Sequence, residues 1–344
     1  MEPVEALERI ADALGRTRGA RPKVTAFRRA ADAIRPLSRD ELAALAARGR
    51  LTDLPGIGQS TATVIEQALR GETPEYLTRV ETDAPAPDAG PPTELAGPIR
   101  AALRGDLHLH SDWSDGGHTI AAMADAGAAL GHDYLALTDH SGSLRVAKGL
   151  SAERLREQLD VVRGLNAELA PFRILTGIEV DILLDGSLDQ DEELLDELDV
   201  VVASVHTKLR MDAGPMTERM VRALESPHVD VLGHCTGRMV VGQGRPESAF
   251  DAARVFDTAV AHDKAVEINS RPERLDPPSR MLAMLAEREA KVSIDSDAHA
   301  TWQLDWQVYG AHRAAAAGIP PERIVNTWPA ETLLAWTATH AGTG

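Results

Sequence analysis

The sequence predicts an α/β protein, in which a small all-α domain precedes a closed barrel of parallel strands. Three observations lead to this prediction. Before residue 80, apolar residues recur only at helical spacing. After residue 100, short apolar segments alternate seven times with amphipathic segments, which is typical of a parallel sheet with helical crossovers. The 344 residues suffice for one large and one small domain, and seven repeats in this length favour a closed barrel over an open sheet.

The N-terminal domain is expected over residues 1–80. Apolar residues at helical spacing predict helices over 4–14, 25–35, 38–48 and 59–70. Ser38, followed by Asp40 and Glu41, is a start signal for the third of them. Residues 81–99, ETDAPAPDAGPPTELAGPI, have no apolar periodicity and are rich in Pro, Ala and Asp. This segment is predicted to be a linker.

The barrel domain is expected over residues 100–340. Its strands are predicted at 105–109, 133–138, 173–180, 199–205, 229–233, 265–269 and 291–295. Its helices are predicted at 118–130, 151–169, 189–197, 215–225, 248–262, 278–289 and 303–317. Each strand is followed by a helix, so the domain consists of seven βα units.

Composition narrows the class of protein. A hydrophobic content of 43% and a charged content of 26% are ordinary for a globular protein. No apolar run approaches the roughly 18 residues of a membrane span, so we expect no membrane partner. The N-terminal segment MEPVEALERI is acidic and amphipathic, unlike a signal peptide, and the single cysteine, Cys235, fits a reducing compartment. We therefore expect a cytoplasmic protein, and nothing in the pattern requires more than a monomer.

Charge is distributed unevenly along the chain. The net charge is −17. Residues 1–80 hold 13 basic and 11 acidic residues, which leaves −19 on residues 81–344. Within residues 16–50, ten residues are basic and three are acidic. The overall balance argues against a nucleic-acid-binding protein, whereas the N-terminal domain is locally basic. Bound metal ions would neutralise part of the acidity of the barrel.

Nine potential metal ligands lie at the ends of the predicted strands. They are His108, His110, Asp115, His140, Glu179, His206, His234, Asp297 and His299. Barrel enzymes place their active sites at the carboxyl ends of the strands. Imidazoles and carboxylates bind Zn²⁺, Mn²⁺ or Fe²⁺, and nine of them exceed what one ion can use. The sequence therefore predicts a multinuclear metal centre, and such centres most often hydrolyse phosphate esters.

A purely structural role is the alternative for each motif taken alone. His108 and His110 share one face of a strand and could simply be half-buried. However, buried carboxylates such as Glu179 and Asp297 would be costly without cations, and the motifs recur at equivalent points. Asp106 and Asp139 are expected to hydrogen-bond neighbouring imidazoles, and Cys235 to be a buried packing residue. The remaining histidines are expected to have surface or packing roles: His118, His132, His228, His262, His312 and His340.

Residues 105–330 resemble a PHP (polymerase and histidinol phosphatase) domain, in particular that of bacterial family X DNA polymerases. The matching motifs are DLHLHSDWSDG, YLALTDHS, ILTGIEVDIL, VVASVH, VDVLGHCTGR, AVEINSRPERLD and VSIDSDAH. The resemblance implies a distorted (β/α)₇ TIM-like barrel with three divalent metal ions, Zn, Mn or Fe. It assigns to the first ion His108, His110, Glu179 and Asp297. It assigns to the second Asp115, His140 and His299, and to the third Glu179 (bridging), His206 and His234. Cys235 stands where the family commonly has proline.

The expected chemistry is attack by metal-activated water, with all nine ligands catalytic. Basic residues near the strand ends are expected to bind phosphate oxygens, and a surface role is the alternative for each. They are Arg145, Lys148, Lys208, Arg238 and Arg271, with Arg274 beside the last. Arg238 and Arg271 are favoured because each follows a ligand-bearing or inward strand end. Asn269 is expected to support the same rim.

Residues 54–58, LeuProGlyIleGly, followed by a predicted helix near Ser60, are a helix–hairpin–helix signature. We expect Gly56, Ile57 and Gly58 to contact a DNA backbone through their N–H groups. Residues 22–80 resemble the small N-terminal domain of family X polymerases. The segment QSTATVIEQAL lacks the lysine that members with lyase activity use, and the polymerase palm is absent, so we expect neither lyase activity nor DNA synthesis. The alternative is a packing or interaction domain.

The predicted function is that of a metal-dependent phosphoesterase acting on DNA, most simply a 3′–5′ exonuclease of DNA repair. A small-molecule phosphatase resembling histidinol phosphatase is the first alternative, favoured by the acidic barrel, which repels long polyanions. A non-catalytic DNA-binding scaffold is the second, and the complete ligand set opposes it. The expected partner is accordingly DNA or a small phosphorylated substrate.

Overall fold

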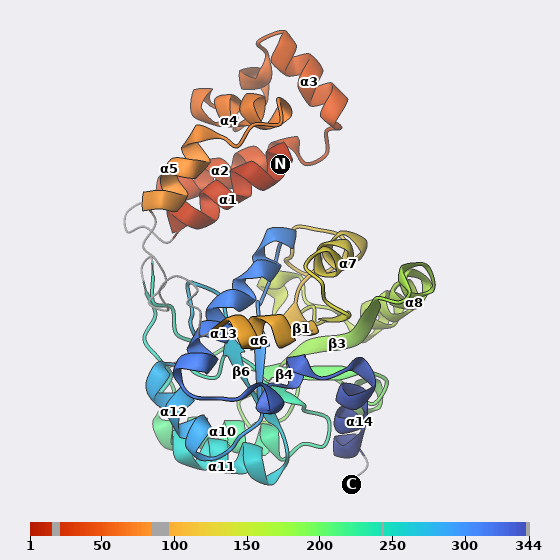
Figure 1. Cartoon of the computed structure of the whole chain (residues 1–344), viewed down its shortest axis with the longest axis vertical. Coiled ribbons are helices and arrows are strands. Elements are labelled where there is room, and N and C mark those ends of the chain that lie inside the picture. Colours follow the sequence, from red (N-terminus) through yellow and green to blue (C-terminus); the bar gives the residue numbers. More distant parts are fainter. Residues whose placement is uncertain (16–20, 84–95, 242–243, 342–344) are drawn as a thin grey trace. The chain divides into compact units, whose positions relative to one another are not determined.

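The protein divides into two compact units in the computed structural model, with the boundary after residue 86 (Figure 1). The structure describes residues 1–15, 21–83, 96–241 and 244–341. Of the predicted linker, residues 84–95 lie outside this described part, while 81–83 and 97–99 belong to helices. No helix of the described residues is long and apolar enough to cross a bilayer.

The N-terminal unit is entirely helical, as predicted. Its helices are α1 (Pro3–Gly15), α2 (Arg21–Ile34), α3 (Arg39–Ala47), α4 (Gln59–Leu69) and α5 (Glu75–Asp83), with a 3₁₀ turn at Leu51–Asp53. Ser38 caps α3: the Ser38 N–H donates to Glu41 at 2.8 Å, and the Ser38 hydroxyl accepts from the Glu41 N–H at 3.3 Å. This reciprocal pair is the predicted capping box. Helix α5 was not predicted, because it buries only Leu77 and Val80 and so shows little periodicity.

The larger unit contains one sheet of seven parallel strands in sequence order. They are β1 (Gly105–Leu109), β2 (Tyr134–Leu137), β3 (Arg173–Asp181), β4 (Val200–Ser204), β5 (Val231–Leu232), β6 (Ala265–Asn269) and β7 (Val292–Asp295). A parallel bridge between Leu109 and Ala298 joins the ends of β1 and β7. The sheet is therefore a nearly closed barrel, and the predicted fold class is confirmed.

Helices precede, separate and follow the strands of the barrel along the chain. They are α6 (Gly97–Ala102), α7 (Ile120–Ala129), α8 (Ala152–Leu169), α9 (Glu192–Leu195), α10 (Ala213–Leu224), α11 (Ala252–Ala261), α12 (Ser279–Glu287), α13 (Gln307–Ala316) and α14 (Ala330–Ala341). The helix predicted at 189–197 is the single turn α9, and α6 and α14 were not predicted. His340 of α14 places Nδ1 2.6 Å from Asp230 Oδ1, so this histidine packs internally.

Side-chain alternation positions the site along the inward face of the strands. Leu175, Val202 and Ala265 belong to one buried apolar cluster within the barrel. Toward the carboxyl end, the same face of each strand carries a polar residue. Glu179 lies four residues after Leu175 on β3, Ser204 lies two after Val202 on β4, and Glu267 lies two after Ala265 on β6. The apolar residues thus fill the barrel on the amino-terminal side of the site, and the polar residues collect at the carboxyl ends of the strands.

Candidate metal centre

Glu179 lies at the centre of the predicted ligands. Its Oε1 is 3.2 Å from His206 Nε2 and 3.0 Å from His234 Nε2. Its Oε2 is 3.3 Å from His108 Nε2 and 2.7 Å from His140 Nδ1. The carboxylate is 1% exposed and has one oxygen turned to each of two groups of imidazoles. This is the geometry expected of a bridging ligand.

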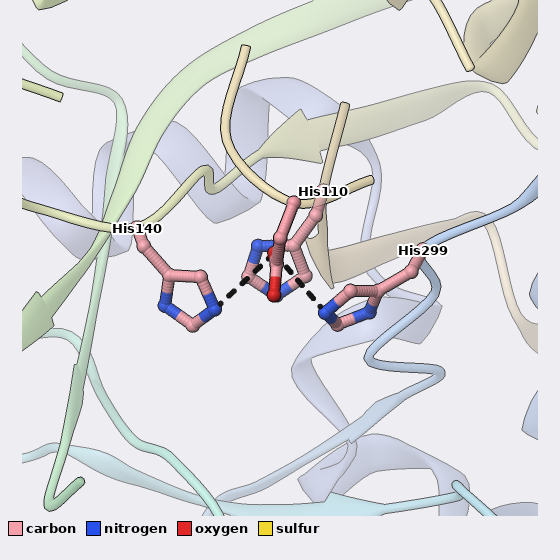
Figure 2. Close-up of side chains that lie close together, drawn as sticks. His110, His140 and His299 are labelled. Atoms are coloured by element: carbon pink, nitrogen blue, oxygen red, sulfur yellow. Dashed lines mark ion pairs between the residues drawn. The ribbon is translucent and has the colours of Figure 1, made fainter. Parts of the chain in front are cut away.

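Asp115 contacts His140 and His299 at the more exposed side of the site. Its Oδ1 lies 3.5 Å from His140 Nε2 and 3.3 Å from His299 Nε2, and Figure 2 shows these contacts as dashed lines beside the ring of His110. The ring of His110 is 4.4 Å from that of His140 and 4.3 Å from that of His299, between centroids. Burial raises the pKa of Asp115, but His299 outweighs it, so the net shift is downward.

Asp297 completes the set on the side of β7. Its Oδ1 is 3.5 Å from His110 Nε2, and its Oδ2 accepts from the Asn269 amide at 3.1 Å. The backbone of Asp297 is left-handed, with φ 53°, and its N–H donates to the carbonyl of His108 at 2.9 Å. The pairing of β1 with the end of β7 therefore fixes this carboxylate.

Three groups of side chains present ligand atoms within 4.8 Å of one another. The first is His110, Asp115, His140 and His299, the second is His108, His110 and Glu179, and the third is His140, Glu179 and His206. Seven of the nine predicted ligands belong to these groups, while His234 contacts Glu179 and Asp297 contacts His110. The sequence-based grouping differs in detail, because His110 and His140 each take part in two groups.

Many of these ligand atoms are buried without a hydrogen-bond partner among the described residues. They include His108 Nε2, His140 Nδ1, both ring nitrogens of His110 and His206, and both oxygens of Glu179. Buried polar atoms are rarely left unpaired in folded proteins. A converging set of imidazole and carboxylate lone pairs is the donor set of Zn²⁺, Mn²⁺ and Fe²⁺. The residues therefore fit divalent metal ions.

Burial and the neighbouring carboxylates shift the pKa values of the imidazoles in opposite directions. Burial lowers the pKa of both His110 and His234 to about 3, so both rings are neutral at physiological pH, as a metal ligand must be. For His206, burial lowers the pKa, but Glu179 and Asp181 outweigh it and raise it to about 9. The carboxylates thus supply the negative charge that cations, or protons in their place, would neutralise.

Two protein domain families match the chain. The PHP domain matches residues 106–271, and a helix-hairpin-helix domain matches residues 1–74. The chain contains a PHP domain. The resemblance inferred from the motifs is therefore confirmed, and the predicted enzyme class, a metal-dependent phosphoric ester hydrolase, is confirmed at the level of the family.

A DNA polymerase/exonuclease and phosphatases are among the proteins similar to this chain. Over 224 residues, the chain is 39% identical to the DNA polymerase/3′-5′ exonuclease PolX of Bacillus subtilis, a match that covers 65% of this chain and 39% of that protein. It is 29% identical over 234 residues to a "Probable phosphatase" of Syntrophotalea carbinolica, covering 64% of this chain and 90% of the relative. The structure of histidinol phosphate phosphatase from Lactococcus lactis, with zinc, L-histidinol and phosphate, matches with a TM-score of 0.45 at 18% identity, over 62% of this chain and 92% of that one.

Several predicted ligands of the PHP domain contact carboxylates that the sequence analysis missed. Glu267 Oε1 lies 2.7 Å from His108 Nδ1, and Glu267 Oε2 accepts from the N–H of His234. Asp181 Oδ1 lies 3.4 Å from His206 Nδ1. A signal was present for Glu267, since a glutamate in the middle of a predicted buried strand needs a partner.

The expected roles of Asp106 and Asp139 were wrong. Asp106 accepts from the backbone N–H groups of His108 and Ser296, and Asp139 accepts from the hydroxyls of Ser111 and Ser114. Neither carboxylate reaches an imidazole in these contacts, because both lie behind the strand ends and hold the backbone that follows them. Cys235 is buried, at 3% exposure, as expected.

The PHP site opens into a cavity of about 350 Å³. Besides predicted ligands, Arg245, Arg271 and Arg274 line it, and Arg274 Nε is 3.1 Å from Asp297 Oδ2. Arg271 therefore lies at the cavity, as the sequence predicted, whereas the position of Arg245 at the cavity was not predicted.

The other predicted phosphate-binding residues do not line this cavity. Arg145, Lys148 and Lys208 are exposed on loops. The Arg238 guanidinium instead donates to the carbonyls of Arg274, at 3.0 Å, and of Leu275. Arg238 therefore supports the loop that carries Arg271 and Arg274, which corrects its predicted contact with phosphate.

The predicted DNA-contacting turn lies between the 3₁₀ turn and α4. Gly56 has φ 86°, which glycine adopts without strain, and Gly58 is the N-cap of α4. Ile57 is 6% exposed and belongs to the core of the unit. Its side chain is therefore a packing residue, and contact with DNA through this turn would involve backbone atoms and the two glycines.

Proposed function

We propose that this PHP-domain protein hydrolyses phosphodiester bonds of DNA, most simply as a 3′–5′ exonuclease in DNA repair. The observation that carries the proposal is the convergence of nine predicted ligand side chains, with Glu179 at their centre, in a chain that also has a helix-hairpin-helix unit. The similarity to PolX supports it, although the match spans 39% of that relative. We also propose that the protein is monomeric and cytoplasmic. A single, buried, free cysteine is consistent with a reducing compartment.

In this proposal the nine side chains hold three divalent ions. Such ions activate a water molecule for attack on phosphorus and neutralise charge on the phosphoryl oxygens. Glu179 orders the two groups of imidazoles by facing both with one carboxylate. Glu267 orients the ring of His108, and Asp181 accepts from the backbone N–H of His206 at 3.1 Å. Arg245 and Arg271 are available to bind non-bridging phosphate oxygens, a contact for which the guanidinium group is well suited.

The helix-hairpin-helix unit would bind the DNA backbone without reading its sequence. The support is the exposed turn at Gly56 and Gly58 at the start of α4, together with the ten basic and three acidic residues within 16–50. This charge offsets the repulsion between a polyanion and the acidic barrel.

The test offers the full chain, loaded with Mn²⁺, single-stranded DNA labelled at its 5′ end. The proposal predicts products that shorten one nucleotide at a time from the 3′ end. The activity should disappear in His140→Ala, because His140 contacts both Glu179 and Asp115. It should also weaken as salt is raised. DNA that stays intact with metal-replete protein would contradict the proposal.

A small-molecule phosphatase is the second candidate. The net charge of −19 on residues 81–344 disfavours long polyanions, and the match to the Syntrophotalea protein covers 90% of that relative. The same preparation is therefore offered histidinol phosphate and p-nitrophenyl phosphate. Fast turnover of these monoesters with intact DNA would support the second candidate and exclude the first.

A further inference from the structure

The loop at residues 141–150 leaves the barrel directly after His140 and returns beside it. Ser141 and Leu150 form a parallel bridge, and the Leu150 N–H donates to the carbonyl of His140 at 2.7 Å. A Cβ on Gly149 would lie 1.9 Å from the carbonyl oxygen of Ser141, so only glycine permits this crossing. The two ends of the loop are thus fixed to a predicted ligand.

Further contacts hold the body of the loop in place. Asp189 Oδ1 accepts from the Ser141 hydroxyl at 2.6 Å, and Asp189 Oδ2 accepts from the Ser143 N–H at 2.9 Å. The Arg154 guanidinium donates to the Lys148 carbonyl at 2.8 Å. Residues 144–148, which we call the specificity loop, are therefore held at the edge of the cavity.

The specificity loop presents apolar side chains to the metal centre. Leu144, Val146 and Ala147 line the same cavity as Glu179 and Asp115. Val146 is 92% exposed, more than any other exposed large hydrophobic residue of the described chain. Together, Leu144, Val146 and Ala147 form an apolar surface on the cavity, where a bound substrate would cover it.

Charges around the cavity restrict what that ligand can be. The carboxylates that line it are Asp115, Glu179 and Asp297, and all three are predicted metal ligands. No further carboxylate among the described lining residues is left to bind an ammonium group. The cavity therefore offers no site for an ammonium group beside Val146, and the apolar side chains favour an apolar face of the substrate there.

Two cations flank this apolar surface. Arg145 and Lys148 are exposed on either side of Val146 and Ala147. Alternation of apolar and basic side chains matches a nucleic-acid strand, in which flat bases alternate with phosphates.

We propose that the specificity loop binds the terminal nucleotide of a single strand, with Leu144 and Val146 against its base. Arg145 and Lys148 hold the neighbouring phosphate. The inference rests on the proposed function and deepens it, because it selects a strand with an unpaired terminal base over a monoester that carries an ammonium group.

The experiment compares two single-stranded oligonucleotides on the Mn²⁺-loaded full chain. One ends in an ordinary 3′ nucleotide, and the other ends in an abasic residue. The measured quantity is the ratio of their kcat/KM values. Burial of apolar surface of Leu144 and Val146 against a base is worth on the order of tenfold in affinity, so we expect a ratio of about 10 for the wild type. For Val146→Ser the ratio should approach 1, through a higher KM for the ordinary strand.

Val161→Ser is the matched control, because Val161 is also an exposed valine, at 40%, but lies on the outer helix α8. This control should retain the wild-type ratio. The double variant Arg145→Gln, Lys148→Gln should raise KM for both strands and reduce the slope of log KM against log salt by about 1 to 2.

The outcomes separate the two proposals. If the wild type cleaves DNA but Val146→Ser keeps the full ratio, the specificity loop does not contact the base, and the inference is overturned while the proposed function stands. If the wild type leaves both strands intact, the proposed function and the inference fall together.

Discussion

Glu267 Oε1 lies 2.7 Å from Nδ1 of His108, and the other oxygen of Glu267 accepts from the N–H of His234. One buried carboxylate on β6 therefore orients an imidazole from β1 and fixes the backbone beside a second imidazole after β5. Burial raises the pKa of Glu267 to about 7, although His108 opposes this shift.

Replacing Glu267 is expected to weaken metal binding. Glu267→Gln keeps the size of the side chain but no longer accepts strongly from His108, and loss of such a partner typically costs about 10- to 100-fold in metal affinity. Competition with a fluorescent chelator measures the dissociation constant for Zn²⁺. Glu287→Gln, an exposed substitution on α12, should leave it unchanged. An equal affinity in both variants would show that Glu267 does not support the centre.

Removal of metal is expected to destabilise the PHP unit. The buried nitrogens and oxygens around Glu179 lose their partners when the site is stripped. An ion present at about 100 times its dissociation constant adds about 2.7 kcal/mol to the free energy of unfolding. For a unit of this size that corresponds to a Tm about 5 to 10 °C higher. Calorimetry with Mn²⁺ and then with EDTA measures the shift, which should be much smaller in His206→Ala.

His132 is expected to make the protein sensitive to mild acid. The residue is 5% exposed, and burial, with help from Arg100, lowers its pKa to about 4. Between pH 6.5 and 4 the unfolded chain takes up a proton at this position and the folded chain does not. Stability is therefore lost as pH falls through this window, by about 2 kcal/mol at pH 5.

Urea unfolding at pH 7 and pH 5 tests this assignment. His132→Gln should lose less stability between the two pH values than the wild type does. Exposed His262→Gln is the control and should follow the wild type. A His132→Gln protein with the same acid sensitivity as the wild type would refute the role of this ring.

Alanine substitutions at two glycines of the N-terminal unit distinguish a loss of DNA contact from a loss of stability through backbone strain. Gly56 has φ 86° and Gly71 has φ 78°, so alanine at either position should cost about 1 kcal/mol of stability. Only Gly56 lies in the turn before α4. In fluorescence anisotropy with EDTA present, Gly56→Ala should bind labelled DNA several-fold more weakly, and Gly71→Ala should bind as the wild type does. Equal losses would assign the effect to stability alone.

Much of the site was predictable because its ligands come in short motifs at strand ends. His108 and His110 need only the alternation of a strand to share a face, and Asp297 and His299 lie within one turn of chain. The supporting residues were harder to predict. Asp181 directly follows the predicted apolar strand at 173–180, and nothing in the local sequence indicates its partner. Its contact with His206 depends on the register of β3 with β4, which no local pattern specifies.

The helices, like the site residues, were predictable where a local sequence pattern specifies them and were missed where tertiary contacts do. The amphipathic helices that cover the barrel were found from their periodicity, whereas α14 was missed. Its sequence AETLLAWTATHA is apolar around much of its circumference, and its place is set by tertiary contacts, such as the bond from Trp336 Nε1 to the carbonyl of Asp263 at 3.0 Å. The orientation of Arg238 was likewise unpredictable, since the carbonyls that it binds belong to residues 274 and 275.

The position of Glu179 has one more consequence. A single carboxylate faces both halves of the centre, so the halves cannot be filled or emptied independently. An ion in one half would fix the rotamer of Glu179 and neutralise part of the negative charge that an ion in the other half would meet. The affinities of the two halves are therefore coupled, and a substitution that empties one half should change the dissociation constant measured for the other.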